Sequence, residues 1–220
     1  LVDDESELGS ACVDFGGGTT TIAVFMRGEF VHADAIAIGG QHVTNDIARG
    51  LSTRLEDAER LKTVHGSVLV HAADEREILS TRAIGDEDEP AHQITRAGLN
   101  RIIRPRVEEI LELVRDRLNA SGFAGLVGKR MVLTGGGSQL TGLVEAARKV
   151  LARNVRVGRP LGVSGMPDVA KGPAFATAVG LLIYPQVAPM DQIEAGGAHY
   201  AMTGTGGYFS RVGRWIRESF

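Results

Sequence analysis

The pattern of apolar and polar positions along the chain predicts a mixed α/β fold. Short apolar runs that contain β-branched residues are typical of β-strands. Such runs occur at 11–14, 20–25, 131–133 and 155–157, with a weaker alternation at 30–38. Between 67 and 95 the pattern changes to short β segments, at 68–70 and 78–79, with polar loops and an acidic turn at 86–90 between them.

Apolar residues at helical spacing predict helices over 97–119 and 140–152, and Pro105 is placed to begin or kink the first of these. Thr44, Asn45 and Asp46 are typical capping residues, and they predict a helix from there to Leu55. A short helix is expected over 57–62. An apolar helix over 173–184, rich in small residues, is expected to pack in the core, with Pro185 ending the domain.

Two of the predicted strands lead directly into three consecutive glycines. The first turn follows Asp14 and contains Gly16, Gly17, Gly18, Thr19 and Thr20. Glycines let backbone amides approach a bound anion, the threonines add hydroxyl donors, and Asp14 could hold a hydrated Mg²⁺ through its waters. A glycine-rich hairpin that binds no ligand accounts for this turn alone equally well.

The second turn is the stronger indication of a nucleotide site. It consists of Gly135, Gly136, Gly137 and Ser138, again directly after an apolar strand, and it leads into the predicted helix at 140–152. Two strand-to-glycine turns in one chain predict two sides of one nucleotide-binding site.

Composition and charge exclude several classes of protein. The 220 residues carry a formal charge of −3 at pH 7, which argues against binding of nucleic acid through bulk electrostatics. Cys12 is the single cysteine, so we expect no internal disulfide, no cysteine-based zinc site and a reducing, cytoplasmic setting. Residues 1–10 are acidic and unlike a signal peptide, and the apolar segment 174–184 is shorter than the roughly 18 residues that span a membrane.

The two glycine turns resemble those of the actin-like ATPase superfamily, whose core is a ribonuclease H-like α/β domain. The resemblance implies that Gly16 to Thr19 bind phosphate and that Gly135 to Gly137 lie under the adenosine of ATP. Glu59 and Lys62 are three residues apart, and their spacing alone favours a solvated ion pair. In bacterial actins an Ala-Glu-x-x-Lys element at this place sits beside the ribose and adenine, so the resemblance implies that role here.

The same resemblance divides the chain into parts. It implies an actin-like core at 1–66 and 107–185, with a small α+β outer subdomain at 67–106 inserted in it. It also implies that another domain precedes the core, so the chain is expected to be the C-terminal half of a larger protein. Residues 186–207 are rich in glycine and read as a flexible linker.

The last segment, 208–220, predicts an amphipathic helix. Aromatic and apolar residues share one face and three arginines lie off it, a composition typical of an interfacial membrane helix. A terminal helix folded back on its own domain is the alternative. The residues expected to contact an anionic membrane are Phe209, Arg211, Val212, Arg214, Trp215, Ile216, Arg217 and Phe220.

These features together resemble the FtsA family of bacterial cell-division actin homologues, over essentially the whole chain. The resemblance implies a scaffold that binds ATP and Mg²⁺, polymerises with itself, helps recruit other division proteins, and ties FtsZ filaments to the cytoplasmic face of the inner membrane at the septum. It places the docking site of the FtsZ C-terminal peptide on the outer subdomain, near Arg96, Arg101 and Arg104. A solvated helical face is the simpler interpretation of these arginines.

One residue departs from the superfamily pattern. Many actin-like ATPases have Asp two residues after the first threonine of the phosphate loop, and this chain has Thr21. We therefore expect at most a weak ATPase, since the first domain is needed for hydrolysis as well. A soluble actin-superfamily ATPase of the pilus-assembly or chaperone type is the alternative function, and the basic amphipathic tail argues against it.

Overall fold

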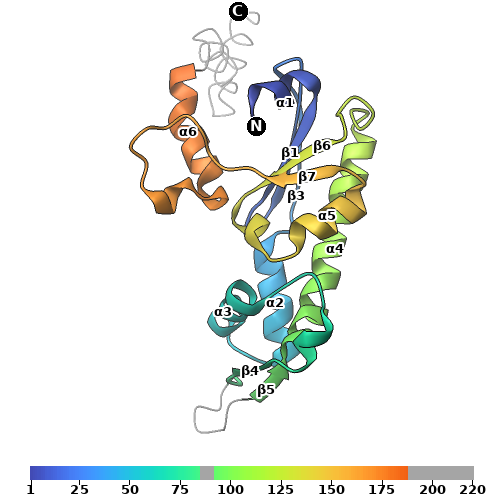
Figure 1. The fold of residues 1–220 in the computed structure, drawn as a ribbon, viewed down its shortest axis with the longest axis vertical. Helices are drawn as coiled ribbons and strands as arrows, with labels where there is room; N and C mark the ends of the chain where they lie inside the picture. Colours follow the sequence, from blue (N-terminus) through green and yellow to red (C-terminus); the bar gives the residue numbers. More distant parts are fainter. Residues whose placement is uncertain (85–91, 188–220) are drawn as a thin grey trace, which may run out of the picture. The chain divides into compact units, whose positions relative to one another are not determined.

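A computed structural model describes residues 1–84 and 92–187 (Figure 1). The chain divides into two compact units, 1–179 and 180–220, and the account below concerns the first unit. Within the described ranges, no helix is both long enough and apolar enough to cross a membrane.

A mixed five-stranded sheet forms the centre of the first unit. The N-terminal helix α1 (Asp3–Leu8) precedes three antiparallel strands, β1 (Ser10–Phe15), β2 (Thr20–Met26) and β3 (Glu29–Ile36). Strands β6 (Arg130–Thr134) and β7 (Asn154–Val157) continue the sheet in parallel, in the order β3-β2-β1-β6-β7. Strand β1 is therefore central, and Ala11 and Val13 are fully buried. The strands predicted at 11–14, 20–25, 30–38, 131–133 and 155–157 are confirmed.

Three helices follow the antiparallel strands, and two of them differ from the prediction. Helix α2 (Gly40–Leu51) begins at Gly40 rather than at Thr44 to Asp46, because Gly39 is its N-cap and two backbone bonds described below anchor its start. Helix α3 (Leu55–His65) contains the predicted short helix. Helix α4 (Arg96–Ala120) is continuous, with Pro105 inside it rather than at its start.

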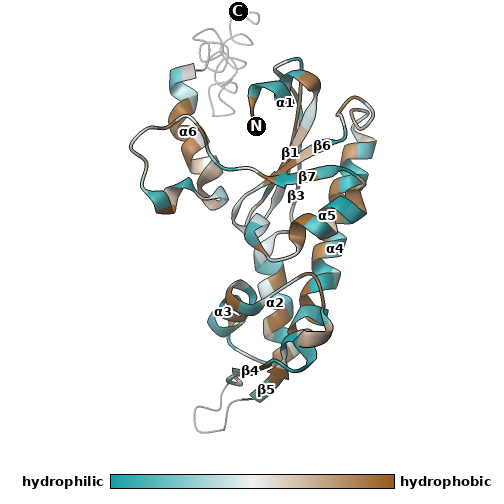
Figure 2. Cartoon of the chain, in the orientation of Figure 1, coloured by the Kyte–Doolittle hydropathy of each residue, from teal (hydrophilic) through white to brown (hydrophobic). Residues whose placement is uncertain are grey.

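The sequence of α4 explains why it packs as it does. Thr95 caps it by accepting a hydrogen bond from the Gly98 amide at 3.0 Å. Hydrophobic and hydrophilic residues alternate along the helix (Figure 2), and its apolar stripe is buried. The buried apolar positions are Ala97, Leu99, Ile103, Val107, Ile110, Leu111, Val114 and Leu118.

Among its described residues, the part predicted as an outer subdomain contains the 3-10 turn η1 (Ala72–Glu75), a two-stranded sheet of β4 (Ile78–Thr81) and β5 (His92–Thr95), and the first part of α4. The expected strand at 68–70 is absent: in this stretch of the described chain only Ser67 forms a bridge, to Thr141. The predicted acidic turn at 86–90 lies within 85–91, outside the described residues.

The second glycine turn continues as the 3-10 turn η2 (Gly136–Gln139), and α5 (Leu143–Leu151) begins later than predicted. After β7 the chain forms two further 3-10 turns, η3 (Asp168–Lys171) and η4 (Pro173–Phe175), and then α6 (Ala176–Val187). Pro185 lies inside α6, so it does not end the helix.

The core role predicted for 173–184 is wrong for its first part. Within 173–179 only Pro173 and Val179 are buried, while Ala174, Phe175 and Ala178 are exposed. Residues 186 and 187 belong to α6 rather than to a linker. The rest of the predicted linker, 188–207, and the predicted membrane helix, 208–220, lie outside the described residues.

Candidate functional site

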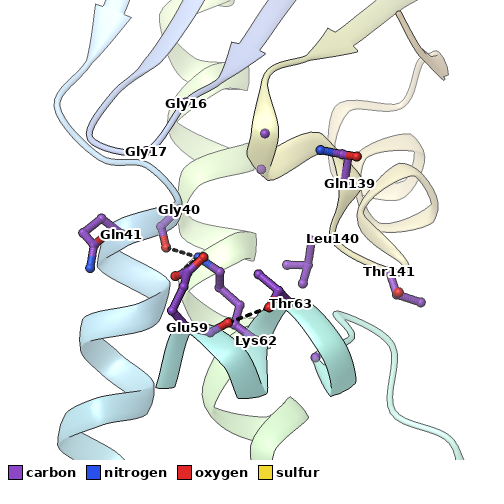
Figure 3. Close-up of a pocket in the computed structure, with 13 residues that line it drawn as sticks. Gly16, Gly17, Gly40, Gln41, Glu59, Lys62, Thr63, Gln139, Leu140 and Thr141 are labelled. Carbon is purple, nitrogen blue, oxygen red and sulfur yellow. Dashed lines mark hydrogen bonds and ion pairs between the residues drawn. The ribbon is translucent and has the colours of Figure 1, made fainter. Parts of the chain in front are cut away.

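The two glycine turns lie side by side at one edge of the sheet. Strands β1 and β6 are parallel neighbours, and Asp14 is paired in register with Thr134 at their carboxyl ends. In open α/β sheets this edge is where ligands bind. A cavity of about 400 Å³ opens here, and Gly16 and Gly17 of the first turn and Gly136 and Gly137 of the second turn line it. Figure 3 shows Gly16 and Gly17 across this cavity from Gln139 and Leu140.

Helix α2 fixes the first turn in place. The amides of Gly40 and Gln41 donate to the carbonyl oxygens of Gly16 and Gly17, at 2.9 and 2.8 Å. A Cβ on Gly39 would lie 2.6 Å from both of those oxygens, so only glycine permits this approach. The start of α2 therefore binds the turn rather than a ligand.

The outer part of the same turn remains open. A Cβ on Gly17 or Gly18 would meet nothing within 4 Å. Among the described residues, neither amide donates a hydrogen bond. Adjacent amides without a hydrogen-bond acceptor, in a turn at the end of a strand, are suited to bind an anion.

The second turn is packed tightly against the first strand. Gly135 has a φ of +81°, and a Cβ there would lie 2.1 Å from Asp14 Oδ1. A Cβ on Gly137 would lie 2.3 Å from Phe15 Cδ1. Both positions require glycine, so these residues hold the backbone close to β1.

The side chains of Glu59 and Lys62 form the floor of the cavity. Lys62 Nζ lies 2.6 Å from Glu59 Oε2, and it also donates to Thr44 Oγ1 at 2.8 Å and to the Gly40 carbonyl at 3.1 Å. The Thr44 hydroxyl donates to the same glutamate oxygen. Figure 3 shows Lys62 reaching Gly40, so these bonds join α2 to α3 beneath the cavity.

Opposing effects act on the pKa of Glu59. Burial raises this pKa, but the hydrogen bonds from Lys62 and Thr44 outweigh burial and lower it overall. The Lys62 side chain is 14% exposed and that of Glu59 46% exposed. Glu59 is therefore ionised at neutral pH, with a carboxylate oxygen accessible to a ligand.

Asp14 lines an adjacent cavity of about 460 Å³, which Gly16, Gly17 and Gly136 line as well. The Thr177 hydroxyl donates to Asp14 Oδ2 at 2.5 Å. Within the described ranges no cluster of three or more metal-ligating side chains exists. One carboxylate surrounded by hydroxyls fits an ion held mainly through water, which suits Mg²⁺ better than a metal that needs several protein ligands.

Two predicted ligand donors have structural partners instead. Thr20 is buried and its hydroxyl donates to the Ile38 carbonyl at 2.8 Å, while the buried Ser138 hydroxyl donates to the Gly135 carbonyl at 2.7 Å. Both hydroxyls hold the turns. Thr19, in contrast, is exposed and lines the cavity that contains Asp14.

Sequence reasoning missed several residues that line the first cavity. They are Gly40, Gln41, Thr63, Gly66, Gln139, Leu140 and Thr141. The Gly39-Gly40 pair before α2 was a usable signal, because two glycines at a helix start indicate a close backbone approach. Gln139 and Thr141 carry no comparable signal, since they flank the glycine turn in an ordinary polar context.

Comparison with known proteins decides the family. The sequence profile described as "Cell division protein FtsA" matches residues 11–180. The chain belongs to the FtsA family. It is 63% identical to the FtsA of Rhizobium meliloti over 222 residues and 35% identical to that of Escherichia coli K12 over 227 residues. These matches cover 100% of this chain but 50% and 53% of the relatives, so this FtsA-family chain spans about half their length.

Solved structures confirm an actin-like mixed α/β fold for this FtsA-family chain. MreB 5 of Spiroplasma citri bound to AMPPNP matches with a TM-score of 0.63 at 18% identity, over 89% of this chain and 57% of that one. The PilM-PilN type IV pilus biogenesis complex matches with a TM-score of 0.61 at 22% identity, over 85% and 48%.

The three arginines expected near the peptide-docking site, Arg96, Arg101 and Arg104, each pair with a carboxylate. Arg96 lies 3.0 Å from Glu77, Arg101 pairs with Glu75, and Arg104 lies 2.8 Å from Glu108. Arg106 is held by Asp46 and Glu109, each at 2.6 Å. The surface is thus a mixed one of alternating charge.

Proposed function

We propose that this chain forms the second half of the ATP site of an FtsA-type cell-division scaffold. One observation carries the proposal: two glycine turns and the Glu59–Lys62 pair, which are far apart in the sequence, line one cavity at the carboxyl ends of parallel strands. The amides of Gly17 and Gly18, which donate no hydrogen bond within the described residues, would bind phosphate oxygens. Glu59 would accept hydrogen bonds from the ribose hydroxyls, and Gly136 and Gly137 would lie under the adenine.

Asp14 would hold Mg²⁺ through water, and Thr177 orients its carboxylate. The ion would neutralise phosphate charge in the cavity lined by Asp14, Thr19 and Thr21. Because Thr21 is not an acid, this half supplies no second carboxylate there to activate a water molecule. We therefore propose strong dependence of nucleotide binding on Mg²⁺ and weak hydrolysis.

The test is a titration of the ¹⁵N-labelled chain with Mg·AMPPNP to millimolar concentration, followed by NMR. Gly17→Asp is the decisive variant, because space is free at Gly17 and the new carboxylate would repel phosphate. Gly125→Asp is the matched control, since nothing lies within 4 Å of a Cβ there either, and Gly125 lines neither of these two cavities.

For the wild-type chain and for Gly125→Asp, we expect the ligand to change the chemical shifts of amides in the two glycine turns and in α3. For Gly17→Asp we expect no such changes. Equal shifts in both variants would show that nucleotide does not use this turn. If no chemical shift of the wild-type chain changes at millimolar ligand, the proposal that this chain binds nucleotide on its own is wrong.

The further parts of the proposed function follow from family membership. They are self-assembly into filaments, recruitment of other division proteins, capture of the FtsZ C-terminal peptide near Arg96, Arg101 and Arg104, and attachment to the inner membrane at the septum through 208–220. The ion pairs of these arginines would have to open for an acidic peptide to bind, which favours a weak, salt-sensitive contact.

Attachment to the membrane is tested by co-sedimentation with vesicles that contain anionic lipid, at low salt. Trp215→Glu places a charge on the predicted apolar face of 208–220, and Met202→Glu makes the same kind of change in the predicted linker. We expect the wild-type chain and Met202→Glu to sediment with vesicles and Trp215→Glu to stay in solution. A soluble actin-superfamily protein becomes the better account if all three stay in solution.

A further inference from the structure

A third cavity, lined mainly by polar residues, lies on the other side of α3 from the proposed nucleotide site. Its volume is about 450 Å³. Arg54, Asp57, Arg60 and His65 line it from α3 and its N-cap, and Ser80 and Arg82 line it from the end of β4. Glu59, Lys62 and Thr63 face the first cavity, so the helix presents a different set of side chains to each.

The backbone that carries these groups is held in place. Residues 52–53 and 82–84 run antiparallel, with a bridge between Thr53 and Ala83 and a bond from the Ile84 amide to the Ser52 carbonyl at 2.9 Å. The buried Thr53 hydroxyl donates to the Arg82 carbonyl at 2.6 Å. Arg82 therefore projects from a fixed backbone position beside the start of α3.

The cavity has an excess of positive charge. Arg54 Nε pairs with Asp57 Oδ2 at 3.1 Å, so those two charges offset each other. Arg60 and Arg82 make no ion pair and no side-chain hydrogen bond within the described part of the chain. By contrast, each of the three arginines of the expected partner surface on α4 has a carboxylate partner.

We propose that this cavity is an anion site for a compact phosphate-bearing ligand of the diphosphate class. Guanidinium groups bind phosphate oxygens in a bidentate manner, and two of them from different elements can hold one divalent group between them. The Ser80 hydroxyl is exposed at the same rim and adds a donor. His65 Nδ1 lies 3.8 Å from Glu77 Oε1 and is directed to that acid.

The experiment is isothermal titration of the whole chain with inorganic diphosphate at low salt. It uses the Gly17→Asp background, so that binding at the glycine turn does not contribute. Arg60→Gln/Arg82→Gln removes the two guanidinium groups that carry the proposal. Arg49→Gln/Arg76→Gln is the control, because it removes the same charge from two exposed arginines that lie outside the cavity.

We expect Arg60→Gln/Arg82→Gln to weaken diphosphate binding by about tenfold or more, and the control pair to change it by less than about threefold. Circular dichroism spectra should match among the variants, since both side chains are at the surface. Equal losses in the two double variants would show non-specific attraction and overturn the proposal. Unchanged affinity in Arg60→Gln/Arg82→Gln, or no binding to the parent chain, would overturn it as well.

Discussion

Gly135 shows how a single residue brings the two halves of the proposed nucleotide site together. Its φ is +81°, and a Cβ at this position would lie 2.1 Å from Asp14 Oδ1, which leaves no room for a side chain. We expect Gly135→Ala to lower the free energy of unfolding by about 2–4 kcal/mol, from left-handed strain and overpacking together.

The control for this prediction is one residue away. A Cβ on Gly136 would meet only Ala174 Cβ at 3.7 Å, an ordinary contact, so Gly136→Ala should change the free energy of unfolding by about 0.5 kcal/mol or less. Urea denaturation followed by circular dichroism measures both. Similar losses in the two variants would contradict the steric argument.

At the scale of residues, the sequence predicted the position of the glycine turns better than the role of the neighbouring hydroxyl groups. Consecutive glycines after a strand are informative because few other contexts require them, and the structure does place both turns at one cavity. The hydroxyls of Thr20 and Ser138 were expected to face a ligand. Their real acceptors, the carbonyls of Ile38 and Gly135, depend on how the chain folds back, which local sequence does not reveal.

At the scale of elements, Asn100 joins α4 to the irregular segment after α3. It is fully buried, and its Oδ1 accepts from the Ser67 amide at 2.8 Å while its Nδ2 donates to Asp74 Oδ2 at 3.2 Å. Asn100→Ala leaves the Ser67 amide without its acceptor and removes one of the hydrogen bonds that Asp74 Oδ2 accepts, so we expect the free energy of unfolding to fall by about 2–3 kcal/mol.

Asn45→Ala is the matched control for Asn100→Ala. Its side chain makes one long hydrogen bond at the surface, with Gln41 at 3.4 Å, and its removal should have little effect on stability. Thermal melts of the two variants provide the comparison. If Asn100→Ala lowers the stability less than Asn45→Ala does, the buried hydrogen bonds of Asn100 make no net contribution to stability.

The elements themselves were predictable where the apolar pattern is clear. The long apolar stripe of α4 and the continuous apolar runs of β1 and β6 are examples. The start of α2 was not, because Gly39 and two carbonyls of the distant glycine turn replace the usual side-chain cap. Residues 68–70 look like a strand in composition but find no neighbouring strand to pair with in the described chain.

At the scale of the whole first unit, an ion pair joins its N-terminal helix to its last strand. Arg156 Nε donates to Glu5 Oε1 at 2.7 Å, and the Glu5 side chain is 6% exposed. The hydrogen bond from Arg156 is the main cause that lowers the pKa of Glu5, against a smaller opposing effect of burial. Ionised Glu5 is therefore more stable in the folded than in the unfolded chain.

This shift predicts how stability depends on pH. A lowered pKa in the folded state contributes stability above the unfolded value of about 4.3, and the contribution disappears as pH falls through the folded value. We expect Glu5→Gln to cost about 1–2 kcal/mol at neutral pH and nothing at low pH. Urea denaturation of the wild-type chain, Glu5→Gln and the exposed control Glu7→Gln, between neutral and low pH, would measure this loss of stability. A loss for Glu5→Gln that stays constant with pH would contradict the prediction.

The order of the strands could not be predicted from local patterns. Residues 11–14 and 131–134 are adjacent in the sheet, and no local pattern states that two segments so far apart in sequence are neighbours. The exposure of 174–178 was not anticipated, because small apolar residues predict close packing without showing which surface they pack against.

Helix α3 lines two cavities and separates them like a wall. Glu59 and Lys62 line one cavity, and Arg60 and His65 line the other. If each cavity binds its proposed ligand and one ligand displaces this wall, thermodynamic linkage requires the two affinities to change by the same factor. A coupling free energy of about 1–3 kcal/mol corresponds to about 5- to 150-fold in each affinity. Binding of a small phosphate-bearing ligand in one cavity would then change the fraction of this chain that carries nucleotide in the other.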